Sequence, residues 1–346
     1  MQSHRRRSLP TSSSGRAALG ELADRRTQTA GRLTELAKRL QAAEALAEGK
    51  ACVYATGSFG RCEASTHSDL DLFILGKSRS DRNESLLKRL DEICIKADLI
   101  EVTRELQIPE FSGDGRYLSH YSVKDFTKTL GTPEDDITNT FTARLLLLLE
   151  SRPLVQPAVY EDLLGEVVEA YWRDYPDHKS DFIPAFLAND ILRLWRTFCV
   201  NYEARTERVP DRQKAKGKLK NYKLKHSRLL TCYSAILSLL AVYRQKQTVM
   251  PVDTLAIIHR SPTERLEWLL EQPDLHDAHS DLKKLLEQYE RFLRTTNHDE
   301  EELVRQFMDR ELSRRYMGQA HEFGDTLFDV LSSIGGGNRF HRILVV

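Results

Sequence analysis

The chain has 346 residues, which is long enough for two domains that each bury a core. Its 51 basic and 51 acidic side chains give a formal net charge of zero, which excludes a global field that would draw it to nucleic acid or anionic lipid. Five cysteines without a Cys-x-x-Cys pair argue against a disulfide framework or a zinc site, and the apolar runs are too short to cross a bilayer. We therefore expect a cytoplasmic protein without a membrane partner.

The first third of the chain predicts a mixed α/β unit. Residues 1–15 contain three arginines at 5–7 with no apolar segment behind them, which predicts a disordered basic arm rather than a secretory signal. Residues 16–49 carry leucines at helical spacing, and residues 51–56 form a short apolar run typical of a buried strand.

The next two segments hold the most informative pattern of the sequence. Residues 57–63 read Gly-Ser-Phe-Gly-Arg-Cys-Glu, and residues 68–72 read Ser-Asp-Leu-Asp-Leu. Strand side chains alternate between two faces, so a strand over 70–75 places Asp69 and Asp71 on one face and the intervening leucines on the opposite, buried face. Two neighbouring carboxylates repel each other unless a cation lies between them.

This pattern suits phosphoryl chemistry. Gly57 and Ser58 at the start of a helix can cradle phosphates, because glycine lets the backbone approach closely and the first helical N–H groups are donors. Asp69 and Asp71 supply the hard oxygen ligands that Mg²⁺ or Mn²⁺ takes when it bridges the phosphates of a nucleoside triphosphate (NTP). We predict an NTP and divalent metal site here.

A third carboxylate would complete such a site. Residues 84–96 have helical spacing, and residues 98–103 are predicted to be a third strand beside the first two. Glu101 and Asp98 are three positions apart, so only one of them can face the metals from a regular strand. We favour Glu101 as the third metal ligand and catalytic carboxylate, with Asp98 as the alternative.

At this point the sequence resembles a known family. Gly-Ser-x-x-Arg-x-Glu followed by Ser-Asp-Leu-Asp-Leu is similar to the motif of the DNA polymerase β-like nucleotidyltransferase superfamily. The form with Gly60, Arg61 and Glu63 is closest to the branch that contains the protein-modifying uridylyltransferase and adenylyltransferase and their uncharacterised relatives. The strong part of the resemblance covers residues 57–75 only.

The resemblance implies a Mg²⁺-dependent transfer of a nucleoside monophosphate from an NTP, with release of pyrophosphate. It also implies that Gly57 and Ser58 bind phosphate and that Asp69 and Asp71 bind metal. Two interpretations stay open for Arg61: a structural pair with Glu63 that steadies the turn, or a direct contact with the phosphates.

The second half of the chain reads as helices. Helical spacing predicts helices over 135–150, 158–171, 182–202, 218–244, 262–270, 282–295 and 300–322. We therefore predict an α+β fold in which a nucleotidyltransferase domain over 16–132, with a small mixed sheet flanked by helices, is followed by a helical substrate-binding domain over 133–334. Residues 335–346, which begin with three glycines, are predicted to be a flexible tail.

Two polar clusters of the helical half are candidates for NTP binding. Asn189, Arg193 and Arg196 share one predicted helix face, and Lys220 and Lys223 share another. These side chains could close over the triphosphate from the far wall of a cleft, although a solvated basic face would have the same pattern.

The expected function is transfer of a nucleoside monophosphate to an acceptor hydroxyl on a protein, an RNA or a small molecule. Two alternatives remain. The basic run 216–228, with Tyr222 inside it, could bind RNA, which would favour an RNA-directed enzyme of a toxin or defence system. A regulatory module that senses NTP without turning it over is the other.

Overall fold

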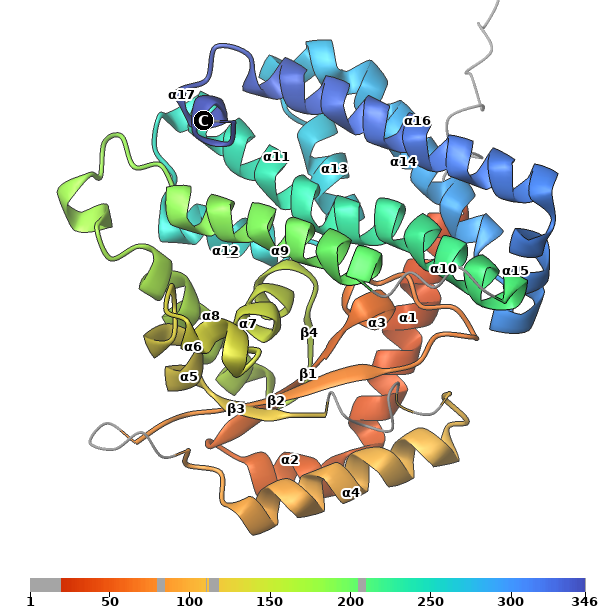
Figure 1. Ribbon diagram of the computed structural model, residues 1–346. Coiled ribbons are helices and arrows are strands. Elements are labelled where there is room, and N and C mark those ends of the chain that lie inside the picture. Colours follow the sequence, from red (N-terminus) through yellow and green to blue (C-terminus); the bar gives the residue numbers. More distant parts are fainter. Residues whose placement is uncertain (1–19, 80–84, 110, 112–117, 205–209, 346) are drawn as a thin grey trace, which may run out of the picture.

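A four-stranded sheet lies between two groups of helices in the computed structural model of the chain, which describes residues 20–79, 85–109, 111, 118–204 and 210–345. Figure 1 shows α2 and α4 beneath the sheet and the helical second half above it. The predicted arm over 1–15 lies outside the described residues.

The sheet contains β1 (Ala51–Thr56), β2 (Asp71–Gly76), β3 (His120–Ser122) and β4 (Arg152–Val155), in the order β3-β2-β1-β4. β1 is antiparallel to both of its neighbours, whereas β2 and β3 are parallel. The small mixed sheet expected from the sequence is therefore confirmed.

Both faces of the sheet are covered, and each face belongs to a different core. Val53, Leu72 and Ile74 are buried in a core with side chains of α1 (Gly20–Arg39), α2 (Gln41–Ala47) and α4 (Arg89–Glu105). Tyr54, Phe73 and Leu75 are buried in the large core of the helical half. Because strand side chains alternate, the central strands β1 and β2 contribute to both cores.

The predicted third strand over 98–103 is wrong, because these residues lie inside α4. Ile95, Leu99 and Val102 recur at a spacing of four and three, and all three are buried in the core beneath the sheet. The alternation of Ile100, Glu101 and Val102 looks like a strand only when this longer period is ignored. The sheet takes its parallel strand from β3 instead.

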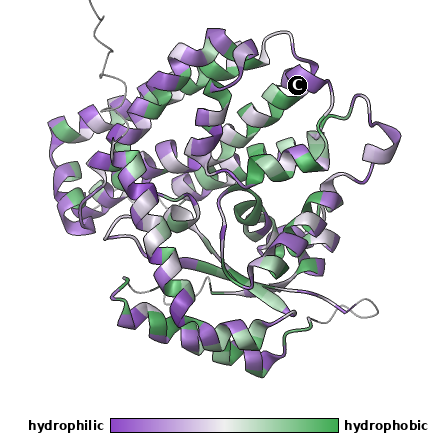
Figure 2. Cartoon of the chain, turned by 180° about the vertical axis from the view of Figure 1, so that it is seen from behind, coloured by the Kyte–Doolittle hydropathy of each residue, from purple (hydrophilic) through white to green (hydrophobic). Residues whose placement is uncertain are grey.

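The second half is almost entirely helical, as predicted, with β4 inserted between α7 and α8. Its helices are α5 (Val123–Lys128), α6 (Glu134–Ile137), α7 (Thr140–Leu149), α8 (Pro157–Tyr171), η1 (Tyr175–Asp177), α9 (Ala185–Ala204), α10 (Asp211–Lys223), η2 (Leu224–Arg228), α11 (Leu229–Lys246), α12 (Pro251–Ile258), α13 (Pro262–Leu270), η3 (Pro273–Ala278), α14 (His279–Thr295), α15 (Glu300–Met308), α16 (Arg310–Gly335) and α17 (Arg339–Ile343). Figure 2 shows apolar ribbon gathered in the middle of the molecule.

The helices of this half differ from the sequence prediction in several places: 300–322 is divided into α15 and α16, 218–244 is divided into α10, η2 and α11, and α12 was not predicted. Three further differences concern the architecture. β4 pairs with β1, so the sheet continues past the predicted domain boundary at 132/133. The predicted helix over 135–150 is divided into α6 and α7 at Asn139, whose φ is 59°. The predicted flexible tail contains α17, because the Phe340 ring is fully buried and packs against Tyr243 with ring centroids 5.9 Å apart.

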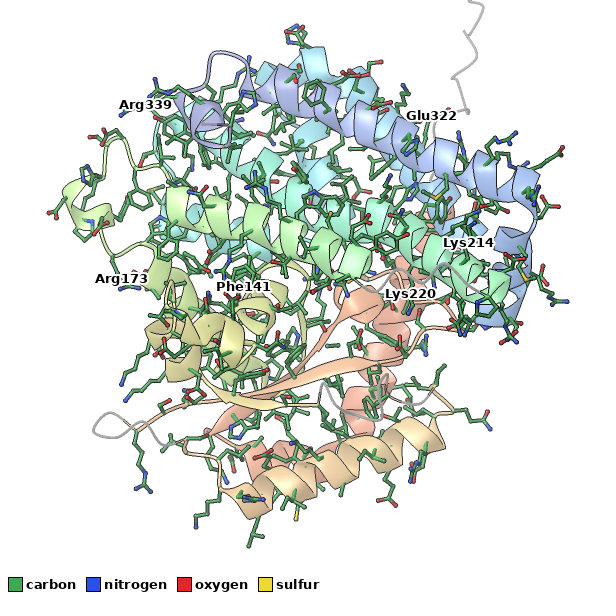
Figure 3. All side chains as sticks on the ribbon, viewed as in Figure 1. Phe141, Arg173, Lys214, Lys220, Glu322 and Arg339 are labelled. Carbon is green, nitrogen blue, oxygen red and sulfur yellow. The ribbon has the colours of Figure 1, made fainter. Side chains whose placement is uncertain are left out.

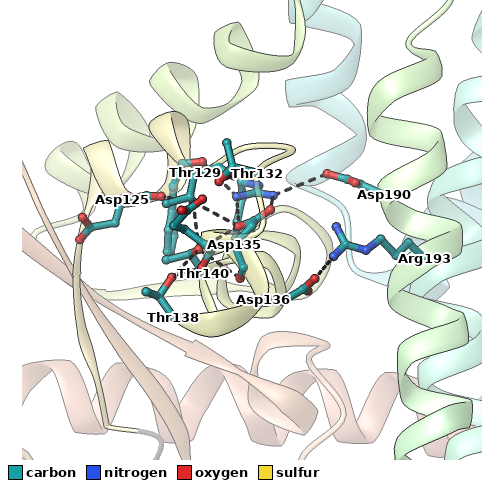
Figure 4. A network of polar contacts seen from close by, with 12 residues as sticks. Asp125, Thr129, Thr132, Asp135, Asp136, Thr138, Thr140, Asp190 and Arg193 are labelled. Carbon is teal, nitrogen blue, oxygen red and sulfur yellow. Dashed lines mark hydrogen bonds and ion pairs between the residues drawn. The ribbon is translucent and has the colours of Figure 1, made fainter.

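A buried polar network fixes several of these helices together (Figure 4). Arg144 of α7 donates two hydrogen bonds to Asp135 of α6 and one to the hydroxyl of Tyr171 of α8, which in turn donates to Asp190 of α9. Burial alone would raise the pKa of Asp135, but the hydrogen bonds and charge of Arg144 hold that pKa below its ordinary value.

Candidate active site

The candidate site forms where β1 ends and β2 begins. The register pairs Thr56 with Asp71, so the turn at Gly57 lies beside the first residue of β2. Gly57 has a φ of 63°, and a Cβ atom added there would lie 2.7 Å from Asp71 Oδ2. Only glycine fits this close approach in this backbone conformation. Ser58 follows in α3 (Gly57–Gly60) and is partly exposed.

Asp69 and Asp71 lie near each other on the side of β2 that faces the helical half. Burial is the main cause that raises the pKa of the Asp71 carboxyl, and the charge of Asp69 raises it further. Leu70 and Leu72 are buried on the opposite side in the core beneath the sheet. The structure thus places two repelling carboxylates side by side at the strand start, which is an arrangement that a cation stabilises.

Cations of the helical half approach this pair. Arg228, the last residue of η2, lowers the pKa of Asp71 by its charge. Lys223, the last residue of α10, is close enough to Asp69 for the two charges to interact. Partial burial lowers the pKa of Lys223, although its side chain still reaches solvent.

Lys220 also belongs to α10 and is exposed. Figure 3 shows it on the side of α10 that is nearest to α3. Its charge and that of Lys223 both lower the pKa of Glu300 at the start of α15. α10 therefore presents two lysines near the site, and part of their charge is balanced by α15.

A buried carboxylate, Glu150, joins the Gly57 turn to the helical half. Its side chain is fully buried and accepts hydrogen bonds from the Gly57 N–H at 3.3 Å, from Arg61 Nη1 at 2.8 Å, from Thr231 Oγ1 at 2.8 Å and from Arg228 Nη1. Burial would raise the pKa of Glu150, but the charges of Arg228 and Arg61 hold it below its ordinary value. The Gly57 N–H is directed into the protein, so it is not the phosphate donor that the sequence predicted.

Arg61 has a structural role. Its Nε donates to Glu63 Oε1 at 2.6 Å and its Nη1 to Glu150, and the side chain is 8% exposed. Glu63 also accepts a hydrogen bond from the hydroxyl of Tyr289 of α14 at 2.7 Å. These contacts support the structural interpretation of Arg61, and the predicted contact with the phosphates stays a prediction.

The contact between α3 and the end of α7 requires a glycine at position 60. A Cβ atom at Gly60 would lie 1.9 Å from the carbonyl oxygen of Glu150, so the α3 backbone contacts the end of α7 directly. The later motif residues Gly60, Arg61 and Glu63 thus connect the turn to the helical half of the molecule. Gly57, at the start of the motif, lies beside the aspartates.

Glu101 and Asp98 do not join the site as a third carboxylate from a neighbouring strand. Both lie on α4, where Glu101 is exposed and Asp98 Oδ2 accepts a hydrogen bond from the backbone N–H of Ala43 of α2. α4 packs beneath the sheet, on the face opposite to the helical half.

The predicted polar cluster of α9 does not lie beside the two aspartates. Asn189, Arg193 and Arg196 line a surface cavity of about 650 Å³ together with the C-terminal residues 343–345. Arg193 is ion-paired with Asp136 and lies over the ring of Phe141. Nothing in these contacts connects the cluster with Asp69 and Asp71.

Within the described residues, no group of three His, Cys, Asp or Glu side chains is arranged to hold a metal ion. The Asp69 and Asp71 pair nevertheless fits Mg²⁺, which is commonly held by one or two carboxylates together with substrate phosphates and water. The pKa of Asp71 is raised by burial and then by the charge of Asp69, and a bound cation would offset both effects on the ionised carboxylate.

Sequence reasoning missed Glu150 and Thr231 and assigned Arg228 no role of its own. Arg228 ends the basic run 216–228, but Glu150 and Thr231 stand in apolar stretches without a motif. Glu150 is 93 residues from Gly57 and 78 from Arg228 along the chain. Only the fold brings these groups together.

Comparison with known families agrees with this geometry. Residues 33–113 match the family described as nucleotidyltransferase domain. This segment contains the Gly57 turn and both aspartates, and it is therefore a nucleotidyltransferase domain of the polymerase β-like superfamily. No curated protein matches the chain.

The family match supports a transferase of nucleotidyl groups in general terms, and it ends before the helical half begins. In the part of the chain that the structure describes, we find no helix with the length and apolar character needed to cross a membrane.

Proposed function

We propose that the protein is a Mg²⁺-dependent nucleotidyltransferase that moves a nucleoside monophosphate from an NTP to an acceptor hydroxyl in the cytoplasm. The observation that carries this proposal is the pairing of Asp69 and Asp71 beside the Gly57 turn, opposite cations of the helical half. The family of residues 33–113 supports the same reaction class.

In the proposed reaction, an acceptor oxygen attacks the α-phosphorus and the bond to the bridging oxygen of the β-phosphate breaks. Pyrophosphate leaves and the acceptor proton passes to solvent. Asp69 and Asp71 would hold Mg²⁺, which supplies charge neutralisation on the phosphates. Ser58 would donate to a phosphate oxygen, and Lys220, Lys223 and Arg228 would balance the triphosphate charge from the other wall.

The RNA-directed alternative receives less support from the contacts of the basic run. Lys216 is ion-paired with Glu300, and Arg212 of the same helix is ion-paired with Glu301. Because α15 partly neutralises α10, this strip is a weaker counterion for RNA than its sequence indicates. We favour an acceptor that is recognised outside this strip.

A non-catalytic NTP sensor is the second candidate, and one observation favours it. A positioned side-chain base would accelerate nucleotidyl transfer by taking the acceptor proton, which otherwise passes to solvent. Within the described residues, the two aspartates are not joined by a third carboxylate that could serve, since Glu150 is held by two arginines. A sensor would bind NTP and Mg²⁺ through the same pair without turnover.

The decisive test is label transfer. The protein is incubated with Mg²⁺, a cell lysate and each of the four α-³²P-labelled NTPs, and label is followed into protein, RNA and small products. We expect metal-dependent labelling of one acceptor class, lost in Asp69→Ala and Asp71→Ala and kept in Glu166→Ala, an exposed carboxylate on α8. NTP binding without labelling under any condition would support the sensor instead.

A further inference from the structure

We propose that Glu150 is a positioning residue for nucleotidyl transfer, which restrains Arg228 beside Asp71 and ties it to the Gly57 turn. This inference rests on the proposed function. Glu150 itself is too deeply enclosed to touch a substrate, so it would act through Arg228.

The location of Glu150 is the first reason. It follows directly on α7, where the partial negative charge of the helix end disfavours a carboxylate, and its side chain is fully buried. A buried charge in such a place is costly unless it is paired. Four donors meet this cost: the Gly57 N–H at the start of α3, Arg61 directly after α3, Arg228 of η2 and Thr231 of α11, so Glu150 fixes these elements relative to one another.

The second reason is the divided environment of Arg228. Its Nη1 is bonded to Glu150, its guanidinium carbon lies 5.2 Å from the ring centroid of Phe198, and the side chain keeps 27% of its exposure. The same Glu150 oxygen that Arg228 contacts also accepts the Gly57 N–H, and a Cβ atom added at Gly57 would lie 2.7 Å from Asp71 Oδ2, so Arg228 and Asp71 both lie at the Gly57 turn. Arg228 therefore stands between an interior carboxylate and the candidate metal ligands.

As a consequence, Glu150 and the Asp69–Asp71 pair compete for the guanidinium of Arg228. Asp69 and Asp71 together form the more negative partner, and without Glu150 the long Arg228 side chain would be drawn onto them. There it would occupy the place of the metal. With Glu150 present, Arg228 stays beside the pair, and its remaining donors can meet a phosphate when the metal-bound NTP enters.

The test measures NTP affinity by equilibrium dialysis with each α-³²P-labelled NTP and Mg²⁺. Glu150→Gln keeps the shape of the side chain but removes the charge that holds Arg228. We expect binding about tenfold weaker, which is the loss of one charge-assisted hydrogen bond. In an Arg228→Gln background the same change should alter affinity less than twofold, because Glu150 then has no Arg228 to restrain.

Asp135→Asn is the matched control, since it also removes a buried carboxylate that is paired with an arginine. It should lower the thermal unfolding temperature and leave NTP affinity unchanged. If Glu150→Gln does not fold at the assay temperature, the comparison with and without Arg228→Gln is repeated with Glu150→Asp. This change keeps the charge and withdraws it by one methylene.

The outcomes separate the two proposals. Wild-type affinity in Glu150→Gln, or an equal loss with and without Arg228, would overturn the positioning role and leave the proposed function intact. A wild-type protein that binds none of the four NTPs would overturn the proposed function and this inference with it.

Discussion

Asp71 combines a buried position with a charged neighbour, and this has a cost for the protein without metal. Its folded-state pKa is raised by burial and by Asp69, so folding disfavours its ionised form. Stability is therefore lost as the pH rises through that pKa. The same features that prepare the carboxylate for a cation destabilise the metal-free fold.

We predict that Asp71→Asn abolishes nucleotidyl transfer and stabilises the metal-free protein by about 1 kcal/mol at pH 7. The gain should shrink as the pH falls through the raised pKa of Asp71, because the wild-type carboxyl then becomes protonated as well. Thermal unfolding at several pH values without Mg²⁺ measures this. A variant that is less stable than wild type at pH 7 would contradict the role given to repulsion.

Gly60 tests the contact between α3 and the end of α7. Gly60→Ala forces a Cβ atom against the Glu150 carbonyl, and we expect a loss of about 3 kcal/mol or more in the free energy of unfolding. Gly165→Ala on α8 is the matched control, because nothing lies within 4 Å of its added Cβ, and it should be neutral or slightly stabilising. Urea unfolding of both variants measures the two changes in the free energy of unfolding.

At this scale the sequence predicted the relative positions of Asp69, Asp71 and Gly57 well, because alternation and turn chemistry are local properties. It could not predict that Arg61 faces Glu150, because that contact joins residues 89 positions apart. The positions of the two aspartates could therefore be predicted from local pattern, whereas the contacts of Arg61 depend on long-range packing.

Among the elements, α4 shows how two periods can compete in one segment. Residues 98–103 satisfy a short strand alternation and a longer helical spacing, and the longer one prevails because α4 continues unbroken from Arg89 to Glu105. Several helices of the second half, such as α8, α13 and α14, were predicted within about three residues at both ends. β4 and α17 were missed because they are short.

We predict that α17 contributes to stability. Phe340→Ala should cost about 3–4 kcal/mol, because the ring is fully buried against Tyr243 and a cavity would remain. Val345→Ala, at a position that is 75% exposed, should change stability by less than about 0.5 kcal/mol. Chemical denaturation of both variants measures the difference, and equal stability would mean that the C-terminal segment is not docked.

For the whole molecule, the two cores make the halves interdependent. The upper face of the sheet, with Tyr54 and Phe73, is part of the large core of the helical half. β4 adds a strand from beyond the predicted boundary at 132/133. The chain is thus organised as a sheet shared between two helical groups rather than as two separable domains.

This organisation predicts that a fragment of residues 16–132 does not fold alone. It would lack β4 and expose one apolar face of the sheet, so we expect no cooperative unfolding transition by circular dichroism, whereas the full chain should unfold in a single one. A fragment with dispersed NMR signals and a sharp thermal transition would show that the predicted domain is autonomous.

The π-helical turn between α10 and α11 has a consequence for how the helical half addresses the aspartates. In η2 the N–H of Leu229 reaches back to the carbonyl of Leu224, five residues earlier. In a regular α-helix, residues five apart such as Lys223 and Arg228 point about 140° away from each other. The wider turn brings such residues into the same angular phase. Rewinding η2 as a regular α-helix with the same residues would therefore rotate one of the two cations away from the aspartates. Deleting one residue from η2 would instead place the two cations four positions apart, where they share a helix face, so the wider turn compensates for the extra residue between them.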